Sequence, residues 1–84
     1  MNKKHTRTLE NIIEKPERSD IPWKDIEGLI IALGGKITEG RGSRVRIYLS
    51  DVRAVFHRPH PKRVTDKGAV SSMRKFLKAA EVIK

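Results

Sequence analysis

The clearest helical pattern places apolar residues at spacings of three and four between residues 22 and 33. Pro22 suits its start, because proline is favoured at the first helical position. Gly34 and Gly35 end it, since glycine readily takes the left-handed conformation that closes a helix. Ser19 or Asp20 is expected to supply a capping side-chain oxygen near its start. The apolar positions are Trp23, Ile26, Leu29, Ile30 and Leu33.

A second helix is predicted near the end of the chain, where Thr65 or Asp66 can cap its first turn. Its apolar stripe consists of Val70, Met73, Phe76, Leu77 and Ala80. This spacing indicates that the stripe belongs to the core rather than to a binding site.

The first 20 residues carry only a weak helical pattern, which stops before Pro16. We therefore expect residues 1–20 to form an N-terminal arm and residues 21–84 to form the folded domain. The sequence leaves open whether the arm orders on this domain or on a partner.

Between the two helices the pattern changes to the alternation that is typical of strands. Lys36–Glu39 is a short candidate strand, and a turn follows at residues 40–42. Residues 43–49 and 52–57 then alternate between apolar and polar positions. Ser50 and Asp51 are suited to a two-residue hairpin turn between them.

A two-residue turn at this point also fixes how the two longer strands pair. One face then pairs Leu49 with Val52, Ile47 with Ala54, and Val45 with Phe56. These residues are all apolar, as a buried face requires. The opposite face pairs Tyr48 with Arg53, Arg46 with Val55, and Arg44 with His57.

The order helix, three strands, helix predicts an α+β sandwich, with the helices on one face of a three-stranded antiparallel sheet. A loop over residues 58–64, which contains Pro59 and Pro61, returns the chain to the last helix. The other face of the sheet is expected to be open to solvent and to carry the arginines.

Composition narrows the classes of function. The 84 residues suffice for one domain, and the chain has no cysteine for disulfides or thiolate metal sites. No apolar run is long enough to span a membrane, and the polar start does not resemble a secretory signal, so we expect a cytoplasmic protein without a membrane partner. The net charge is +9, and residues 36–63 hold eight basic and two acidic residues, a net of +6. This excess favours a polyanionic partner.

The predicted arginine face is a candidate for nucleic-acid binding. Arginine forks match phosphate oxygens, and tyrosine can stack on a base. A merely solvated charged face is the simpler interpretation, but three arginines and a tyrosine on one hairpin favour contact with RNA. The candidate binding residues are Arg41, Arg44, Arg46, Tyr48, Arg53, Arg58, Lys62 and Arg63.

His57 and His60 are the candidates for acid–base chemistry. The unperturbed pKa of histidine, about 6.5, suits proton transfer near neutral pH. In RNA cleavage a base takes the proton of the 2′-hydroxyl, and that oxygen attacks the adjacent phosphorus. Arg44 opposite His57 would stabilise the developing negative charge without a metal. Ordinary loop histidines remain an alternative, and a metal site is not favoured because no third ligand is near. No cofactor is suggested.

Several short segments carry a resemblance to a known family. Gly42-Ser43 lead into the first long strand, His60-Pro61-Lys62 follow the second, and Gly68-Ala69-Val70 begin a helix that continues through Arg74 and Leu77. Together they resemble HicA toxins, the toxin halves of bacterial type II toxin–antitoxin pairs, over about residues 21–83. The stretch from His57 to Pro61, followed by Asp66 to Val70, is the most specific part. Residues 1–20 resemble the N-terminal extension of one HicA subgroup.

The resemblance implies a double-stranded-RNA-binding-like fold with the same order of elements. It also implies metal-independent cleavage of messenger RNA by a toxin that a HicB antitoxin neutralises by covering the active site.

One position departs from the family pattern. The catalytic histidine of the family usually follows the Gly-Ser pair directly, and here that position is Arg44. Arginine stays protonated, so it cannot act as a general base. Our hypothesis is that His57, directly across the hairpin, takes over this role, with His60 as the acid.

Three functions therefore remain open. The chain is an RNA-cleaving toxin, a non-catalytic binder of RNA or DNA, or an interaction module whose main partner is an acidic antitoxin-like protein.

Overall fold

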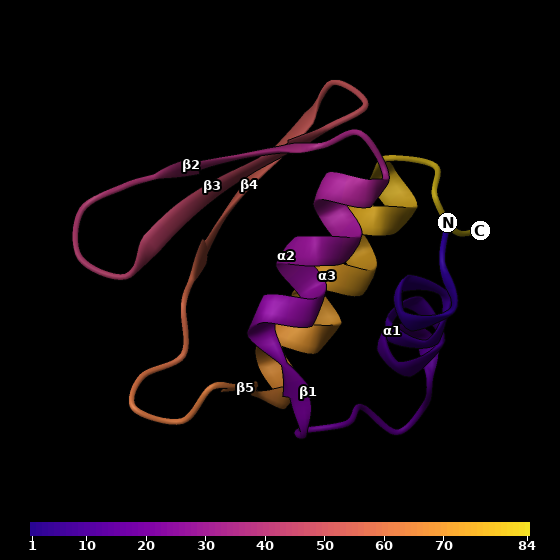
Figure 1. Ribbon diagram of the computed structural model, residues 1–84, viewed down its shortest axis with the longest axis horizontal. Coiled ribbons are helices and arrows are strands. Elements are labelled where there is room, and N and C mark those ends of the chain that lie inside the picture. Colours follow the sequence, from indigo (N-terminus) through magenta and orange to yellow (C-terminus); the bar gives the residue numbers. More distant parts are fainter.

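The computed structural model, which describes residues 1–84, is built around a three-stranded antiparallel sheet. The strands are β2 (Lys36–Glu39), β3 (Arg44–Leu49) and β4 (Val52–His57), in the order β2-β3-β4. Helices α2 (Trp23–Ala32) and α3 (Lys67–Ala79) lie together on one face of this sheet (Figure 1). The predicted α+β sandwich with its helix–three strands–helix order is confirmed.

The predicted register of the hairpin is confirmed at every position. Arg44 is opposite His57, Leu49 is opposite Val52, and the four pairs between them follow in step. Ser50 and Asp51 have φ of 49° and 66°, so both residues adopt the left-handed conformation that a type I′ turn requires. The twist of this turn matches the twist of the flanking strands, which is why two residues suffice.

The start of α2 differs from the expectation. Neither Ser19 nor Asp20 caps it, and no side chain accepts a hydrogen bond from the backbone N–H groups of its start. Instead, strand β1 (Ile21–Pro22) pairs with strand β5 (Val64–Thr65), and the Trp23 N–H donates to the Arg63 carbonyl at 3.0 Å. The expected cap is wrong because this two-stranded pairing satisfies the helix start from a distant segment of the chain.

Two glycines shape the other end of α2. Gly34 has φ of 89°, a conformation that side chains disfavour. A Cβ on Gly35 would lie 2.6 Å from Cγ2 of Ile30 and 2.9 Å from the carbonyl oxygen of Tyr48. The helix can therefore turn closely onto the sheet only because both positions lack a side chain.

The core lies between the helices and the sheet. Asp66 caps α3 as predicted, accepting the Ala69 N–H at 2.8 Å. Phe56 on the inner face of β4 lies between Trp23 of α2 and Phe76 of α3, with ring centroids 5.8 Å and 6.3 Å away. The aromatic contacts join both helices to the sheet.

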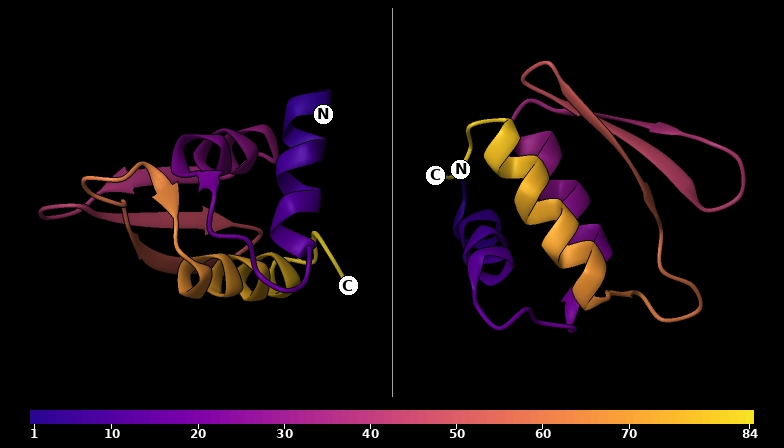
Figure 2. Two further views of the ribbon diagram at one scale, coloured as in Figure 1. Left: turned by 90° about the horizontal axis from the view of Figure 1, so that it is seen from below. Right: turned by 180° about the vertical axis from the view of Figure 1, so that it is seen from behind.

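Residues of the expected arm form a third helix, α1 (Lys3–Ile13), capped by the Asn2 side chain. It lies across α2 and α3 on the side away from the sheet (Figures 1 and 2). Ile12 is fully buried there. The arm therefore orders on the rest of the chain, and no helix of the structure is long and apolar enough to cross a bilayer.

Arg74 of α3 fastens the segment that follows α1. It is 7% exposed, and its guanidinium donates to the carbonyl oxygens of Ile12 at 3.1 Å and Glu14 at 3.0 Å. It also pairs with the Glu17 carboxylate at 2.9 Å. This buried cation therefore binds the segment after α1 through three partners.

We expect Arg74→Met to destabilise the protein by about 2–4 kcal/mol, because it leaves the buried carbonyl of Ile12 and the partly buried carbonyl of Glu14 without this donor while keeping the apolar stem. Urea unfolding measures the loss of stability, and hydrogen exchange should show that the amides of α1 exchange before those of the other helices. Lys75→Met, at the neighbouring exposed position, is the matched control. Equal stability of the two variants would show that α1 docks without Arg74.

Candidate functional site

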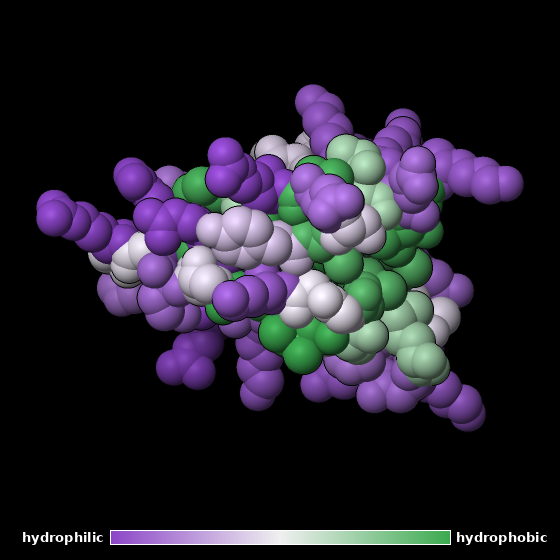
Figure 3. All heavy atoms as spheres, turned by 90° about the horizontal axis from the view of Figure 1, so that it is seen from above, coloured by the Kyte–Doolittle hydropathy of each residue, from purple (hydrophilic) through white to green (hydrophobic).

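The face of the sheet that points away from the helices is the candidate site. Arg44, Arg46, Arg53 and His57 are exposed on it, and Tyr48 is half-buried among them. The buried residues of β3 are Val45, Ile47 and Leu49, which face the helices. Seen from above, hydrophilic side chains project over the part of the molecule that holds the sheet, while hydrophobic surface gathers toward the helices (Figure 3).

Arg44 and His57 face each other at one end of this surface. The Arg58 N–H donates to the Ser43 carbonyl at 2.8 Å. That bond makes Arg44 and His57 a non-hydrogen-bonded pair, the narrower of the two antiparallel pair types. Their Cβ atoms should therefore lie about 4.5–5.5 Å apart, so the guanidinium side chain and the imidazole are direct neighbours on the open face.

His60 lies elsewhere. It lines a hollow of about 470 Å³ with Lys62 and Asp66, in the loop that connects β4 to β5. Neither Arg44 nor His57 lines this hollow. The structure thus brings together two of the three proposed catalytic residues and leaves the third in an adjacent loop.

Arg58, a candidate RNA-binding residue at the start of the loop after β4, does not lie on the open face. Side chains alternate along a strand, so the residue after the outward His57 points inward. Its guanidinium pairs with Glu27 of α2 at 2.8 Å and with Glu39 of β2 at 2.7 Å. The hydrogen bonds that Arg58 donates, first to Glu39 and then to Glu27, raise the pKa of Arg58. Arg58 is therefore engaged within the molecule, where two carboxylates already neutralise it.

The same cluster accounts for Trp23. Its side chain is buried, and the indole N–H donates to the Glu27 carboxylate that also holds Arg58. Trp23 thus packs in the core, as its position on the apolar side of the helix predicts.

The remaining basic candidates lie around the sheet. Arg41 is exposed in the turn between β2 and β3, and Lys62 is exposed in the loop after β4. Arg63 lines a smaller hollow of about 230 Å³ beside Trp23 and Arg58. These side chains lie in the connecting loops and do not belong to the open face.

Comparison with known proteins adds an independent observation. The model of the family described as the HicA toxin of bacterial toxin–antitoxin matches residues 23–82. The chain belongs to the HicA toxin family. No curated protein and no solved structure matches it. As a HicA toxin it is the toxin of a toxin–antitoxin system, and an antitoxin is its implied partner.

The sequence missed one residue of the face of this HicA toxin. Lys36 of β2 is opposite Tyr48 of β3, so it lies on the open face and is exposed. The turn at residues 40–43 fixes the pairing of β2 with β3, so the position of Lys36 could have been predicted by extending the register of the longer hairpin to β2.

No three His, Asp or Glu side chains of this HicA toxin gather as a metal site would require.

The ion pair of Arg58 with Glu39 predicts a pH dependence of stability. The hydrogen bond from Arg58 holds the pKa of Glu39 below its ordinary 4.5. A depressed carboxylate pKa contributes stability that is complete above pH 4.5 and is lost as the pH falls through the folded value. We expect the urea midpoint to fall in this acidic window, and to fall less steeply in Glu39→Gln.

The control is Glu10→Gln, which removes an exposed carboxylate of α1 that forms no ion pair. It should keep the slope of the natural protein. If the urea midpoints of Glu39→Gln and Glu10→Gln fall equally in acid, the ion pair with Arg58 does not cause the loss of stability at low pH.

Proposed function

We propose that the chain binds messenger RNA on the open face of its sheet and cleaves it without a metal, and that a HicB-like antitoxin neutralises it. The observation that carries this proposal is the Arg44–His57 pair within a strongly basic surface. In this proposal residues 21–84 are the RNA-binding domain, residues 1–20 support its helical layer, and RNA as substrate implies a cytoplasmic site of action.

The proposed reaction begins with proton transfer. A neutral His57 imidazole takes the proton of a ribose 2′-hydroxyl, and that oxygen attacks the adjacent phosphorus. Arg44 stabilises the negative charge that builds on the phosphoryl oxygens. The bond from phosphorus to the 5′-oxygen breaks, which leaves a 2′,3′-cyclic phosphate and a 5′-hydroxyl.

The departing 5′-oxygen needs a proton, and His60 is the candidate donor. Because His60 lines a separate hollow, it must approach through movement of the loop after β4 or act through water. We therefore expect His60→Ala to slow cleavage less than His57→Ala.

The antitoxin is proposed to be acidic over the surface that meets this face. Residues 36–63 carry a net charge of +6, from eight basic and two acidic residues. Opposite charges steer association and fix its orientation. An antitoxin that covered Arg44 and His57 would exclude RNA by occupying the same cations.

A second candidate function is non-catalytic binding of RNA or DNA. The observation that favours it is Arg44, which stands where the family usually has its catalytic histidine. A chain that has lost this base would keep its basic face, and with it the affinity for phosphates. The interaction-module alternative also rests on this face, with the antitoxin as its main partner.

We expect His57→Ala to reduce RNA cleavage by a factor of about 100 or more, the usual contribution of a positioned base. The assay uses purified protein in excess over labelled RNA in EDTA, and growth arrest on expression gives the readout in cells. Lys78→Gln, which removes one exposed charge from α3 on the helical side, is the control and should cleave normally.

Undiminished cleavage by His57→Ala would remove His57 from the mechanism. Binding without any cleavage by the natural protein would favour the non-catalytic function over the enzyme.

A further inference from the structure

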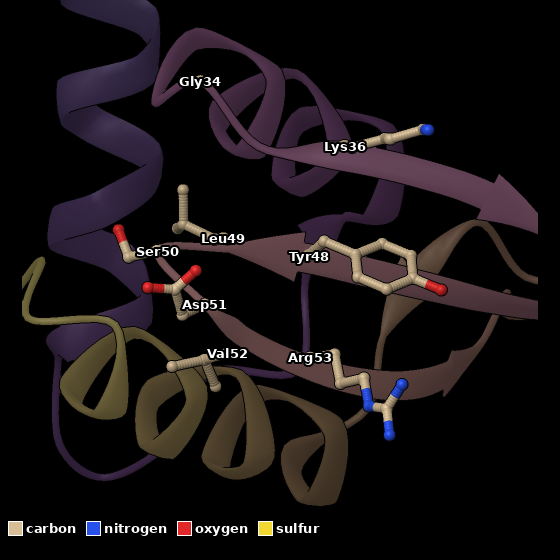
Figure 4. Close-up of a pocket in the computed structure, with 8 residues that line it drawn as sticks. All are labelled: Gly34, Lys36, Tyr48, Leu49, Ser50, Asp51, Val52 and Arg53. Carbon is tan, nitrogen blue, oxygen red and sulfur yellow. The ribbon is translucent and has the colours of Figure 1, made fainter.

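A row of three side chains crosses the open face at the end away from His57. Lys36 of β2 is opposite Tyr48 of β3, and Tyr48 is opposite Arg53 of β4. Figure 4 shows the ring of Tyr48 between the ammonium group of Lys36 and the guanidinium of Arg53. A flat aromatic surface therefore lies between two cations.

The surface is hollowed on both sides of Tyr48. One hollow, of about 500 Å³, reaches toward the turn of the hairpin and is lined by Lys36 and Asp51 among others. A second hollow, of about 330 Å³, is lined by Arg46 and by Val55, which is 54% exposed. Tyr48 and Arg53 line both hollows, so a flat apolar group in either hollow would contact them.

We propose that this row is a stacking subsite for one unpaired base of a single-stranded RNA whose backbone follows β3. The proposal rests on the RNA binding proposed above, although not on cleavage. Tyr48 stacks on the base, while Lys36 and Arg53 bind the phosphates next to it. Lys36 thereby gains a role in binding.

A single strand fits this row better than a duplex does. In a duplex the faces of the bases are covered by their neighbours, so an aromatic side chain on a sheet can stack only on a base that is unpaired. A duplex would meet the same cations through its phosphates alone and would not use the ring of Tyr48. The ring thus distinguishes the two forms of RNA.

The spacing of the rows supports a path along β3. Arg44, Arg46 and Tyr48 follow each other on this face at intervals of two residues, or about 7 Å. Tyr48 is four positions beyond Arg44, so the stacked base lies about 13 Å from the proposed site of reaction. At the far end the Asp51 carboxylate repels phosphates, which limits how far the strand extends beyond Tyr48.

The test measures binding without cleavage. A fluorescent 2′-O-methyl oligoribonucleotide, which lacks the hydroxyl that attacks, is titrated with protein as a single strand and as a duplex. We expect Tyr48→Leu to weaken single-strand binding about tenfold, the usual effect of losing one stacked base, and to leave duplex binding within about twofold. Tyr48→Phe, which keeps the ring, should restore most of the affinity.

Salt dependence separates stacking from charge. For single strands the slope of log K against log salt changes by about 0.7 for each phosphate contact. Arg53→Gln and Lys36→Gln should therefore each reduce the slope by about 0.7, while Tyr48→Leu leaves it unchanged. Thermal unfolding confirms that each variant is folded at the temperature of the titration.

The outcomes distinguish this inference from the proposed function. If Tyr48→Leu and Tyr48→Phe bind the single strand equally, or if Tyr48→Leu weakens duplex binding as much, the stacking subsite is wrong while RNA binding stands. If the natural protein binds neither form of RNA, the proposed function fails first.

Discussion

The two-residue connection between β3 and β4 is the constraint on which the rest of this molecule depends. Ser50 and Asp51 both have positive φ, which allows a tight turn and leaves the strands only one register. Because side chains alternate along a strand, a shift by one residue would turn the arginines into the core and Val45 and Ile47 into water. Core and candidate site are therefore fixed by the same turn.

The same alternation sorts the arginines into two roles. Those that point outward from β3 and β4 remain exposed on the open face. Arg58, which points toward the helices, is paired with Glu27 and Glu39. Arg74 lies on α3 rather than on a strand, and it is engaged with Glu17 and two carbonyl oxygens. The four cations of the open face, Lys36, Arg44, Arg46 and Arg53, form no ion pair within the molecule.

Much of the fold could be predicted from local patterns. The helices α2 and α3, the strands and the register of the hairpin follow from apolar spacing, from glycines, and from a turn of known length. The pairing of β1 with β5 could not be predicted, because two residues on each strand give no alternation to recognise. The end of α1 is bound by Arg74, which is 62 residues beyond Ile12, and no pattern within residues 1–20 contains that information.

The site was predictable to the extent that it follows from the register. Arg44, Arg46, Tyr48, Arg53 and His57 share a face because their positions in the strands require it. Arg58 follows the outward His57 and so points inward, where carboxylates from α2 and β2 meet it. His60 lies in a loop, where no periodicity fixes the direction of a side chain.

The position of the two ends has a practical consequence. Both lie at the end of the molecule away from the open face (Figure 1). A dye, bead or surface tether attached at either terminus would leave the arginines unobstructed, so immobilised protein should present them to solution. A peptide meant to reach around from a terminus would need to cross much of the 31 Å long axis, which takes about ten extended residues.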